Sequence, residues 1–349
     1  MKATIWRVGL AVCACSLLAV FPSPAISQPA AITVFDVPGS IATHPFGIND
    51  EGTTTGSYED SNLTWHGFVR RKDGTFDTFD VPECSVTMPW SINDDGAITG
   101  EAADCNGIGV EYIGFLRDKE GAITTFSGPS TITTIARSIN NHGAITGWSY
   151  TNGFVRETDG ILTTFSPTAA VAVNPLSINN NGTIVGTYTD LNALSRGFVR
   201  DHDGTIFSFS PQGATSTEAL GINDQGTSTG DYADANSKVH GFLRDKDGTI
   251  ISFDIPGSVT MQTWSINDND TVTGYYLDTN SVLHGFARDK DGTITVIDPE
   301  GTVDTSIVGS NCINSNGAIT GSFTDGSFVT HGFVRWSSAP NHGESNDHN

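Results

Sequence analysis

The sequence predicts an all-β fold, a seven-bladed β-propeller of four-stranded antiparallel blades closed by an N-terminal strand that joins the last blade. Three observations predict it. A unit of about 44 residues returns seven times, tight-turn residues divide each unit into four short runs, and one unit is split between the chain ends. Four antiparallel strands in a unit of this length are typical of a propeller blade.

An Ile-Asn pair marks each unit. Its Asn residues follow one another at steps of 44, 47, 39, 44, 44 and 47 residues. They are Asn49, Asn93, Asn140, Asn179, Asn223, Asn267 and Asn314. A Gly stands seven residues after each Asn, and another stands three residues after six of them, with Asp270 as the exception. A Gly-Phe pair followed two residues later by Arg also returns in every unit, from Gly67-Phe68 to Gly332-Phe333.

Each unit divides into four predicted strands. The first precedes Ile-Asn, the second is a run of the Ala-Ile-Thr-Gly type, the third begins at Gly-Phe, and the fourth is rich in Thr and Ile. Asn-Asp-x-Gly lies between the first two strands and Asp-Gly between the last two, and both sequences permit the positive φ of tight hairpin turns. No segment has helical periodicity over a useful length, so we expect no helix.

The two ends of the chain supply one unit between them. The seventh unit ends after its third strand, at residues 333–336, and lacks a fourth. Residues 32–40 instead match the end of the fifth unit at 251–258. We therefore expect residues 31–37 to form the fourth strand of the blade built from about 304–336. Such a strand would close the ring and remove exposed sheet edges at its ends.

Residues 1–27 have the layout of a secretory signal peptide. Lys2 and Arg7 form a positive n-region, an apolar run covers 8–21, and Ala25-Ile26-Ser27 is a small-residue cleavage site. No later stretch is apolar enough to predict a membrane span. The sequence thus predicts a secreted or periplasmic protein, with the propeller over 31–336 and a disordered tail over 337–349.

Charge and cysteine content restrict the partners and the compartment. The formal net charge of −22 repels phosphate backbones, so nucleic acid is not an expected partner. Cys84 and Cys105 lie at equal distances from the hairpin turn of the second unit at 93–96, which predicts a disulfide between them in an exported protein. Cys312 occupies a position filled elsewhere by Ser or Gly, and we expect it to remain a buried thiol.

At the start of the third strand, four units carry a His-Gly-Phe stretch. These are His66-Gly67-Phe68, His240-Gly241-Phe242, His284-Gly285-Phe286 and His331-Gly332-Phe333. Together with the Ile-Asn-x-x-Gly-x-x-x-Gly stretch, the pattern resembles the extracellular HAF-repeat family, whose units carry a His-Ala-Phe-like stretch. Three units depart from it, with Ile113, Asn152 and Arg196 at the His position. The resemblance covers 31–336 and implies an exported repeat protein with β-propeller-like repeats; it transfers no catalytic residues.

An Asp stands six residues before each of these four His residues, and a fifth unit keeps the spacing with Arg. The pairs are Asp60 with His66, Asp234 with His240, Asp278 with His284, Asp325 with His331, and Asp190 with Arg196. Asp and His could act as acid/base dyads or metal ligands. An active site is usually singular, however, so four equivalent pairs favour a structural role in which the carboxylate orients the ring at the hairpin mouth.

Two further motifs are interpreted as hairpin turns. The Asp-x-Asp-Gly turn at 201–204 resembles the start of a calcium-binding loop, but the distal carboxylate that such a loop needs does not follow. Calcium binding by the acidic loops stays an open alternative. Residues 226–230 match the esterase string G-x-S-x-G without the strand–turn–helix context that this motif needs. The sequence therefore predicts no catalytic residue, no metal site and no cofactor.

The positions that vary between units indicate where a ligand could bind. The loops between units and between second and third strands vary strongly, whereas the two tight turns are nearly uniform. Positions near the axis, just before Ile-Asn, carry aromatic and polar side chains, a mixture that suits a glycan, peptide or small molecule. We predict a ligand site on the variable face that includes Phe46, Trp90, Arg137, Glu218 and Trp264.

These observations predict a secreted, monomeric, non-enzymatic binding module whose partner is an extracellular glycan, peptide or protein. Two alternatives stay open: a propeller hydrolase or lyase acting on extracellular polysaccharide, and a purely structural surface protein. Convergent acids beside the axis would favour the enzyme. Glu218 is the only carboxylate among the near-axis positions considered above, which weighs against it.

Overall fold

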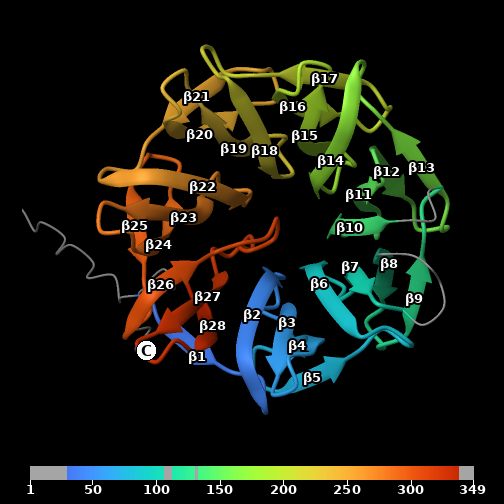
Figure 1. Ribbon diagram of the computed structural model, residues 1–349, viewed down its shortest axis with the longest axis vertical. Helices are drawn as coiled ribbons and strands as arrows, with labels where there is room; N and C mark the ends of the chain where they lie inside the picture. The colour runs from blue at the N-terminus through green and yellow to red at the C-terminus, as the bar shows by residue number, and fades with distance from the viewer. Residues whose placement is uncertain (1–29, 106–111, 130–132, 338–349) are drawn as a thin grey trace, which may run out of the picture. The chain divides into compact units, whose positions relative to one another are not determined.

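The computed structural model describes residues 30–105, 112–129 and 133–337, in which strands and turns alternate and no helix occurs (Figure 1). The predicted leader at 1–27 and the predicted tail beyond residue 337 lie outside the described residues. Within the described ranges, no helix is present that could cross a membrane.

Each unit supplies its strands in the predicted order, with the first strand nearest the centre and the fourth at the periphery (Figure 1). The first strands are β2 (Ser40–Ile48), β6 (Val86–Ile92), β10 (Thr134–Ile139), β14 (Ala170–Ile178), β18 (Ser216–Ile222), β22 (Ser258–Ile266) and β26 (Thr302–Ser306). The second strands are β3 (Thr54–Asp60), β7 (Ile98–Ala103), β11 (Ile145–Ser149), β15 (Ile184–Asp190), β19 (Ser228–Ala233), β23 (Val272–Asp278) and β27 (Ile319–Asp325).

The third strands carry the Gly-Phe pair, and the fourth strands are short. The third strands are β4 (Trp65–Arg70), β8 (Tyr112–Arg117), β12 (Asn152–Arg156), β16 (Ser195–Arg200), β20 (Val239–Arg244), β24 (Leu283–Arg288) and β28 (Thr330–Arg335). The fourth strands are β5 (Phe76–Phe79), β9 (Ile123–Phe126), β13 (Leu162–Phe165), β17 (Ile206–Phe209), β21 (Ile250–Phe253) and β25 (Ile294–Ile297). Five units form separate four-stranded antiparallel sheets, and the first and last units share one eight-stranded sheet.

The strand β1 (Ile32–Phe35) pairs antiparallel with β28, in the place of a fourth strand for the last unit. Its register sets Ile32 opposite Arg335 and Phe35 opposite Gly332. Beyond the ladder, the Trp336 indole nitrogen donates to the Thr33 hydroxyl at 3.0 Å. The two ends of the described chain are therefore held in one sheet, and β28 also touches β2 through the single pair Ala42 and Thr330.

The hydrophobic core is divided among the interfaces between neighbouring sheets. The Phe of each Gly-Phe pair is fully buried. In one interface, for example, Phe115 meets Phe79 of the preceding unit edge to face, with ring centroids 6.0 Å apart. Because the buried apolar residues of the described chain form several small clusters, a low apolar content is sufficient for this architecture.

The Gly seven residues after each Asn allows the second strand to cross closely behind a bulge in the first. In the first unit, the register shifts between Pro45 and Gly47 of β2. A Cβ atom on Gly56 of β3 would lie 2.1 Å from the His44 carbonyl oxygen, so only Gly fits there. The same crossing recurs at Gly230, where a Cβ would lie 1.9 Å from the Glu218 carbonyl oxygen.

The Asn of each Ile-Asn pair is buried and links its unit to the next. Asn49 donates its side-chain N–H to the Asn93 carbonyl at 3.2 Å, and its side-chain oxygen accepts the Thr53 backbone N–H at 2.9 Å. The same donation returns at every Asn, and the series ends with Asn314 donating to the Asn49 carbonyl at 2.9 Å. Asn is needed because it closes its own turn and bridges to a neighbour with one side chain.

Candidate functional site

Four of the five residues predicted to bind a ligand lie around the narrow centre of the molecule. The Phe46 and Trp90 rings have centroids 4.5 Å apart, and the Arg137 guanidinium carbon lies 3.8 Å from the centroid of Trp90. Trp90, Arg137 and Trp264 line one cavity of about 10 Å³ together with Leu176 and Ser310. These aromatic side chains fill much of the axis, which leaves a small space beside the guanidinium.

Glu101 of β7 belongs to the same cluster and was not predicted. It is only 7% exposed and lies beside Trp90 and Arg137. Burial raises the pKa of the Glu101 carboxyl, and the Arg137 charge and the Trp90 indole N–H offset that rise only in part. Burial likewise lowers the pKa of Arg137. The axis thus holds a cation and an acid, both largely removed from water.

Glu218, the fifth predicted residue, lies in a different place. It lines an open pocket of about 260 Å³ between the sheets of β18–β21 and β22–β25. Asp231, Gln262, Tyr275 and Met261 share this pocket. Within the described part of the chain, the Glu218 carboxylate has no hydrogen-bond or ion-pair partner, so its acceptor sites face the pocket unoccupied.

Asp231 is the second acid of this pocket. Its side chain is buried, and both carboxyl oxygens accept the Thr263 backbone N–H at 3.1 Å. Burial, with the nearby Glu218 charge in addition, raises the pKa of Asp231 well above its ordinary value. The Tyr275 hydroxyl donates to the Gln262 side-chain oxygen at 2.7 Å. A neutral acid beside a carboxylate can donate a proton while its neighbour accepts one.

The unpredicted residues Glu101, Asp231 and Tyr275 occupy one position of the repeat, directly after the strand-crossing Gly. Each faces a variable residue of the first strand, namely Met88, Glu218 and Gln262. Directly opposite residues on one face of an antiparallel pair have neighbouring side chains. The variation of this second-strand position between units was the signal in the sequence that could have found them.

Comparison with known proteins bears on the fold. No family model matches the sequence, and no curated protein matches it. Among solved structures, the chain is similar to the β-propeller domain of the Trilobed protease from Pyrococcus furiosus, with a TM-score of 0.58 and 11% identity over 84% of this chain and 96% of that one. The fold is a β-propeller.

Puromycin hydrolase is also similar, with a TM-score of 0.56 and 10% identity over 90% of this chain. This chain spans only 57% of the length of that enzyme. At such low identity the two likenesses establish the propeller fold and carry no activity over to this chain.

The repeated Asp and His residues of the propeller meet as the spacing suggested, but each His has a second carboxylate as well. His66 Nε2 lies 3.6 Å from Asp60, while its Nδ1 lies 2.8 Å from Asp80. The other three follow the same arrangement, His240 with Asp234 and Asp254, His284 with Asp278 and Asp298, and His331 with Asp325 and Asp36. In the fifth pair, Arg196 Nε donates to Asp190 at 3.3 Å.

These Asp residues also close their own turns. Asp60 accepts the backbone N–H groups of Asn62 and Thr64, at 2.8 and 3.0 Å. One nitrogen of each ring therefore faces a carboxylate that closes the hairpin, and the other faces a carboxylate that directly follows a fourth strand or β1. Among the described residues, no group of three or more His, Cys, Asp or Glu is placed to hold a metal ion.

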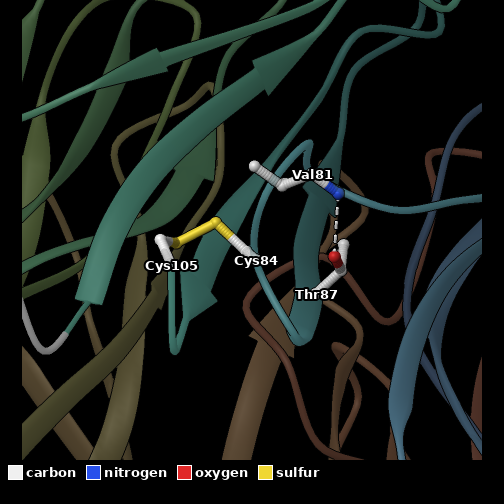
Figure 2. The surroundings of a disulfide bond; sticks show 4 residues. All are labelled: Val81, Cys84, Thr87 and Cys105. Atoms are coloured by element: carbon white, nitrogen blue, oxygen red, sulfur yellow. Dashed lines mark hydrogen bonds between the residues drawn. A yellow bond between two sulfur atoms is a disulfide. The ribbon is translucent and has the colours of Figure 1, made fainter. Parts of the chain in front are cut away.

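The predicted disulfide is confirmed, since Cys84 and Cys105 are bonded (Figure 2). Cys84 stands in the segment before β6, which a hydrogen bond of 3.0 Å from the Val81 N–H to the Thr87 hydroxyl also holds (Figure 2). Cys312 is a free, fully buried thiol, and burial raises its pKa. The thiolate form is thus disfavoured, and Cys312 is expected to be unreactive in the folded protein.

Proposed function

We propose that the chain is an exported, closed, seven-bladed propeller that binds a hydroxyl-rich ligand, an extracellular glycan in preference to a peptide, in the pocket of Glu218 and Asp231. Closure is supported by the pairing of β1 with β28 and by the return of the Asn hydrogen bonds from Asn314 to Asn49. Seven blades are supported by the seven Ile-Asn units. A monomer is proposed, with all seven units in one chain.

Export is supported by the predicted leader and by the disulfide, because disulfides persist in oxidising compartments. The likeness to the HAF-repeat family agrees with this compartment and stays part of the proposal. A secreted or periplasmic protein with a strongly acidic surface meets glycans, peptides and other proteins, and its charge disfavours nucleic acid.

The observation that carries ligand binding is the free carboxylate of Glu218 in an open pocket. Carboxylates accept hydrogen bonds from sugar hydroxyls, and the Gln262 amide adds donors beside it. Met261, Val239 and Tyr232 supply apolar surface in the same pocket. A few polar groups on an apolar wall are typical of small-ligand sites. The pocket lies at the variable positions of the repeat, which agrees with the predicted face.

A glycan and peptide array of the purified protein, followed by titration calorimetry of the strongest glycan, tests this proposal. We expect Glu218→Gln to weaken the affinity about tenfold or more, because a hydrogen bond to a charged group is lost. Glu300→Gln removes an equal charge from an exposed site outside the pocket and should leave the affinity unchanged. Equal affinities for the wild type and Glu218→Gln would place the ligand elsewhere.

The pair of acids also supports a second candidate, hydrolysis of a glycosidic bond. Asp231, whose neutral form burial favours, would protonate the leaving oxygen, and the Glu218 carboxylate would assist water or attack the sugar. Reducing-end release from the glycan that binds separates the two functions. Turnover that Asp231→Asn and Glu218→Gln both abolish would establish the enzyme, and binding without turnover would establish the binding module.

A further inference from the structure

The pocket of Glu218 carries negative charge without a cation to balance it. Among the described residues that line this pocket, Glu218 and Asp231 are acids and none is Lys, Arg or His. The ammonium group of Lys238, which precedes the pocket residue Val239 in the sequence, is already bound to Asp254 at 2.7 Å. The charge of the pocket is therefore left for water or a ligand to compensate.

Three oxygen-bearing side chains from two neighbouring sheets meet in this pocket. Glu218 stands directly opposite Asp231 on β18 and β19, and Tyr275 takes the corresponding place on β23. The Tyr275 hydroxyl gives its proton to the Gln262 side-chain oxygen at 2.7 Å, which leaves the hydroxyl oxygen as an acceptor. Burial raises the pKa of Tyr275, and the charges of Asp231 and Glu218 raise it further, because the three groups lie close together.

A ligand that covers Glu218 displaces water from a carboxylate, and the compensation that the ligand offers decides which one is accepted. A sugar hydroxyl supplies a hydrogen bond and no charge, whereas an ammonium group supplies a positive charge and three donors. An acidic sugar would bring a further negative charge and is repelled. The net charge of −22 adds a long-range attraction for cations. The electrostatics of the pocket thus favour an ammonium group.

The rest of the pocket suits the ring of a sugar. Met261, Val239 and Tyr232 form an apolar wall, and the Gln262 amide nitrogen and the Ser216 hydroxyl offer polar contacts beside it. The volume of about 260 Å³ lies near the lower end of the range for small-ligand sites, so the pocket takes one ring at a time. A bare alkylammonium chain would leave the polar contacts of the wall unused.

We propose, on the basis of the glycan-binding function above, that this pocket selects an amino sugar, a hexosamine unit whose amine is free and protonated. The ammonium group lies among the oxygens of Glu218, Asp231 and Tyr275, and the sugar ring lies against the apolar wall. N-Acetylation removes the positive charge and adds bulk, so the N-acetylated unit is disfavoured. A Lys side chain of a peptide presents the same ammonium group without the ring.

Titration calorimetry with the methyl glycosides of glucosamine and galactosamine, of their N-acetyl forms and of the parent neutral sugars tests this selectivity. We expect the better amino sugar to bind about tenfold or more tightly than its N-acetyl and neutral counterparts, because only the free amine makes a charge-assisted hydrogen bond. Nα-acetyl-lysine amide, which carries the ammonium group without a ring, should bind more weakly than the amino sugar. Added sodium chloride should weaken the binding of the amino sugar and leave that of the neutral sugar unchanged, because salt screens the attraction between charges.

Two variants separate this proposal from glycan binding itself. Glu218→Gln keeps the shape of the side chain and should bring the affinities for the amino and N-acetyl sugars together, whereas Glu300→Gln, at an exposed position outside the pocket, should keep the preference. Equal wild-type affinities for amino, N-acetyl and neutral sugars, all weakened alike by Glu218→Gln, would overturn the amino-sugar assignment and leave glycan binding in place. Equal affinities for the lysine derivative and the amino sugar would also overturn it. Sugar binding that Glu218→Gln does not change at all would overturn both proposals.

Discussion

Asn267 shows how one side chain stabilises both its own turn and the contact between two sheets. Its oxygen accepts the N–H groups of Asn269 and Thr271, at 3.0 and 3.1 Å, and its Nδ2 donates to the Asn314 carbonyl at 3.1 Å. The Asn267 side chain and the Asn314 carbonyl that it reaches are buried, so removing the side chain leaves that carbonyl without its partner in a site away from water. The invariance of Asn in seven units follows from this double role.

We predict that Asn267→Ala lowers the free energy of unfolding by about 2 to 3 kcal/mol, because several backbone groups lose their partner at once. Urea denaturation monitored by tryptophan fluorescence measures the change. Asn192→Ala, at an exposed loop position, is the matched control and should change it by less than about 0.5 kcal/mol. Equal effects of the two substitutions would mean that the buried hydrogen bonds do not contribute.

His284 predicts a pH dependence. Burial alone would lower the pKa of His284, but hydrogen bonds and charges from Asp298 and Asp278 outweigh it and raise the pKa above its ordinary value. Because the pKa is raised in the folded state, protonated His284 adds to the free energy of unfolding. This stabilisation is fully present below the pKa of the unfolded chain and is lost as the pH rises through the pKa of the folded protein. The wild type should therefore exceed His284→Gln in stability by more at pH 5 than at pH 8.5.

Urea denaturation of both proteins at the two pH values measures this difference. His202→Gln, which changes an exposed His outside the four repeated positions, is the control for the substitution itself. A difference between wild type and His284→Gln that is constant with pH would contradict the proposed pairing.

Residues of the candidate site could be predicted from the sequence only where they differ between units at a fixed distance from the Ile-Asn pair. Glu218 was found by its distance from Ile222, but its neighbour Asp231 was not. The bulge between Ala219 and Gly221 shifts the register, so the residue opposite Glu218 cannot be obtained by counting from the turn alone. The Arg137 charge was visible in the sequence, whereas the buried Glu101 beside it depends on packing in three dimensions.

At the scale of elements, the strands and tight turns follow directly from alternating short runs and Asn or Asp with Gly. The second carboxylate of each His was not predicted, because it comes from the end of the fourth strand, as Asp298 does for His284. For His331 that carboxylate is Asp36, which belongs to the other end of the chain. In the last unit, the N-terminal segment thus supplies the second carboxylate that the end of the fourth strand supplies in other units.

We predict that a chain beginning at Pro38, without β1, is less stable than one beginning at Ala30 by several kcal/mol. β28 would lose its ladder to β1, and Phe35 would no longer pack on Phe68 or under Arg70. Differential scanning calorimetry measures the loss. Val34→Ala, which shortens an exposed side chain of β1, is the control and should be nearly neutral. Equal Tm values for the two chains would exclude β1 as a structural strand.

The disulfide gives a second prediction for an element. It closes a loop of 21 residues around the first hairpin of its unit, so Cys84→Ala with Cys105→Ala should lower the free energy of unfolding by about 3 kcal/mol. Dithiothreitol should destabilise the wild type by a similar amount and leave the double variant unchanged. A wild type insensitive to reduction, with both thiols shown free by alkylation after reduction, would contradict this estimate.

At the scale of the molecule, the repeated Arg has a role that the sequence did not indicate. Six of the seven lie over the Phe that ends the fourth strand of the preceding unit, with distances to the ring centroid between 4.6 Å for Arg70 and 5.0 Å for Arg200. Ile297 replaces that Phe in the seventh interface. The periodicity of the sequence predicts that this Arg has the same role in each unit. Only the arrangement of the sheets shows that it contacts the preceding unit.

The place of β1 in the last sheet has a consequence for how the chain folds. Asp36 and His331, which meet across this sheet, are 295 residues apart, so the final sheet requires the closure of almost the whole polypeptide. During synthesis β1 emerges before the other described strands, and its partner β28 emerges after them. In the interval β1 resembles every other fourth strand and can pair with the wrong third strand, or with β28 of a second copy. Slow refolding and strand-exchanged dimers at high concentration are the expected kinetic result of this connection.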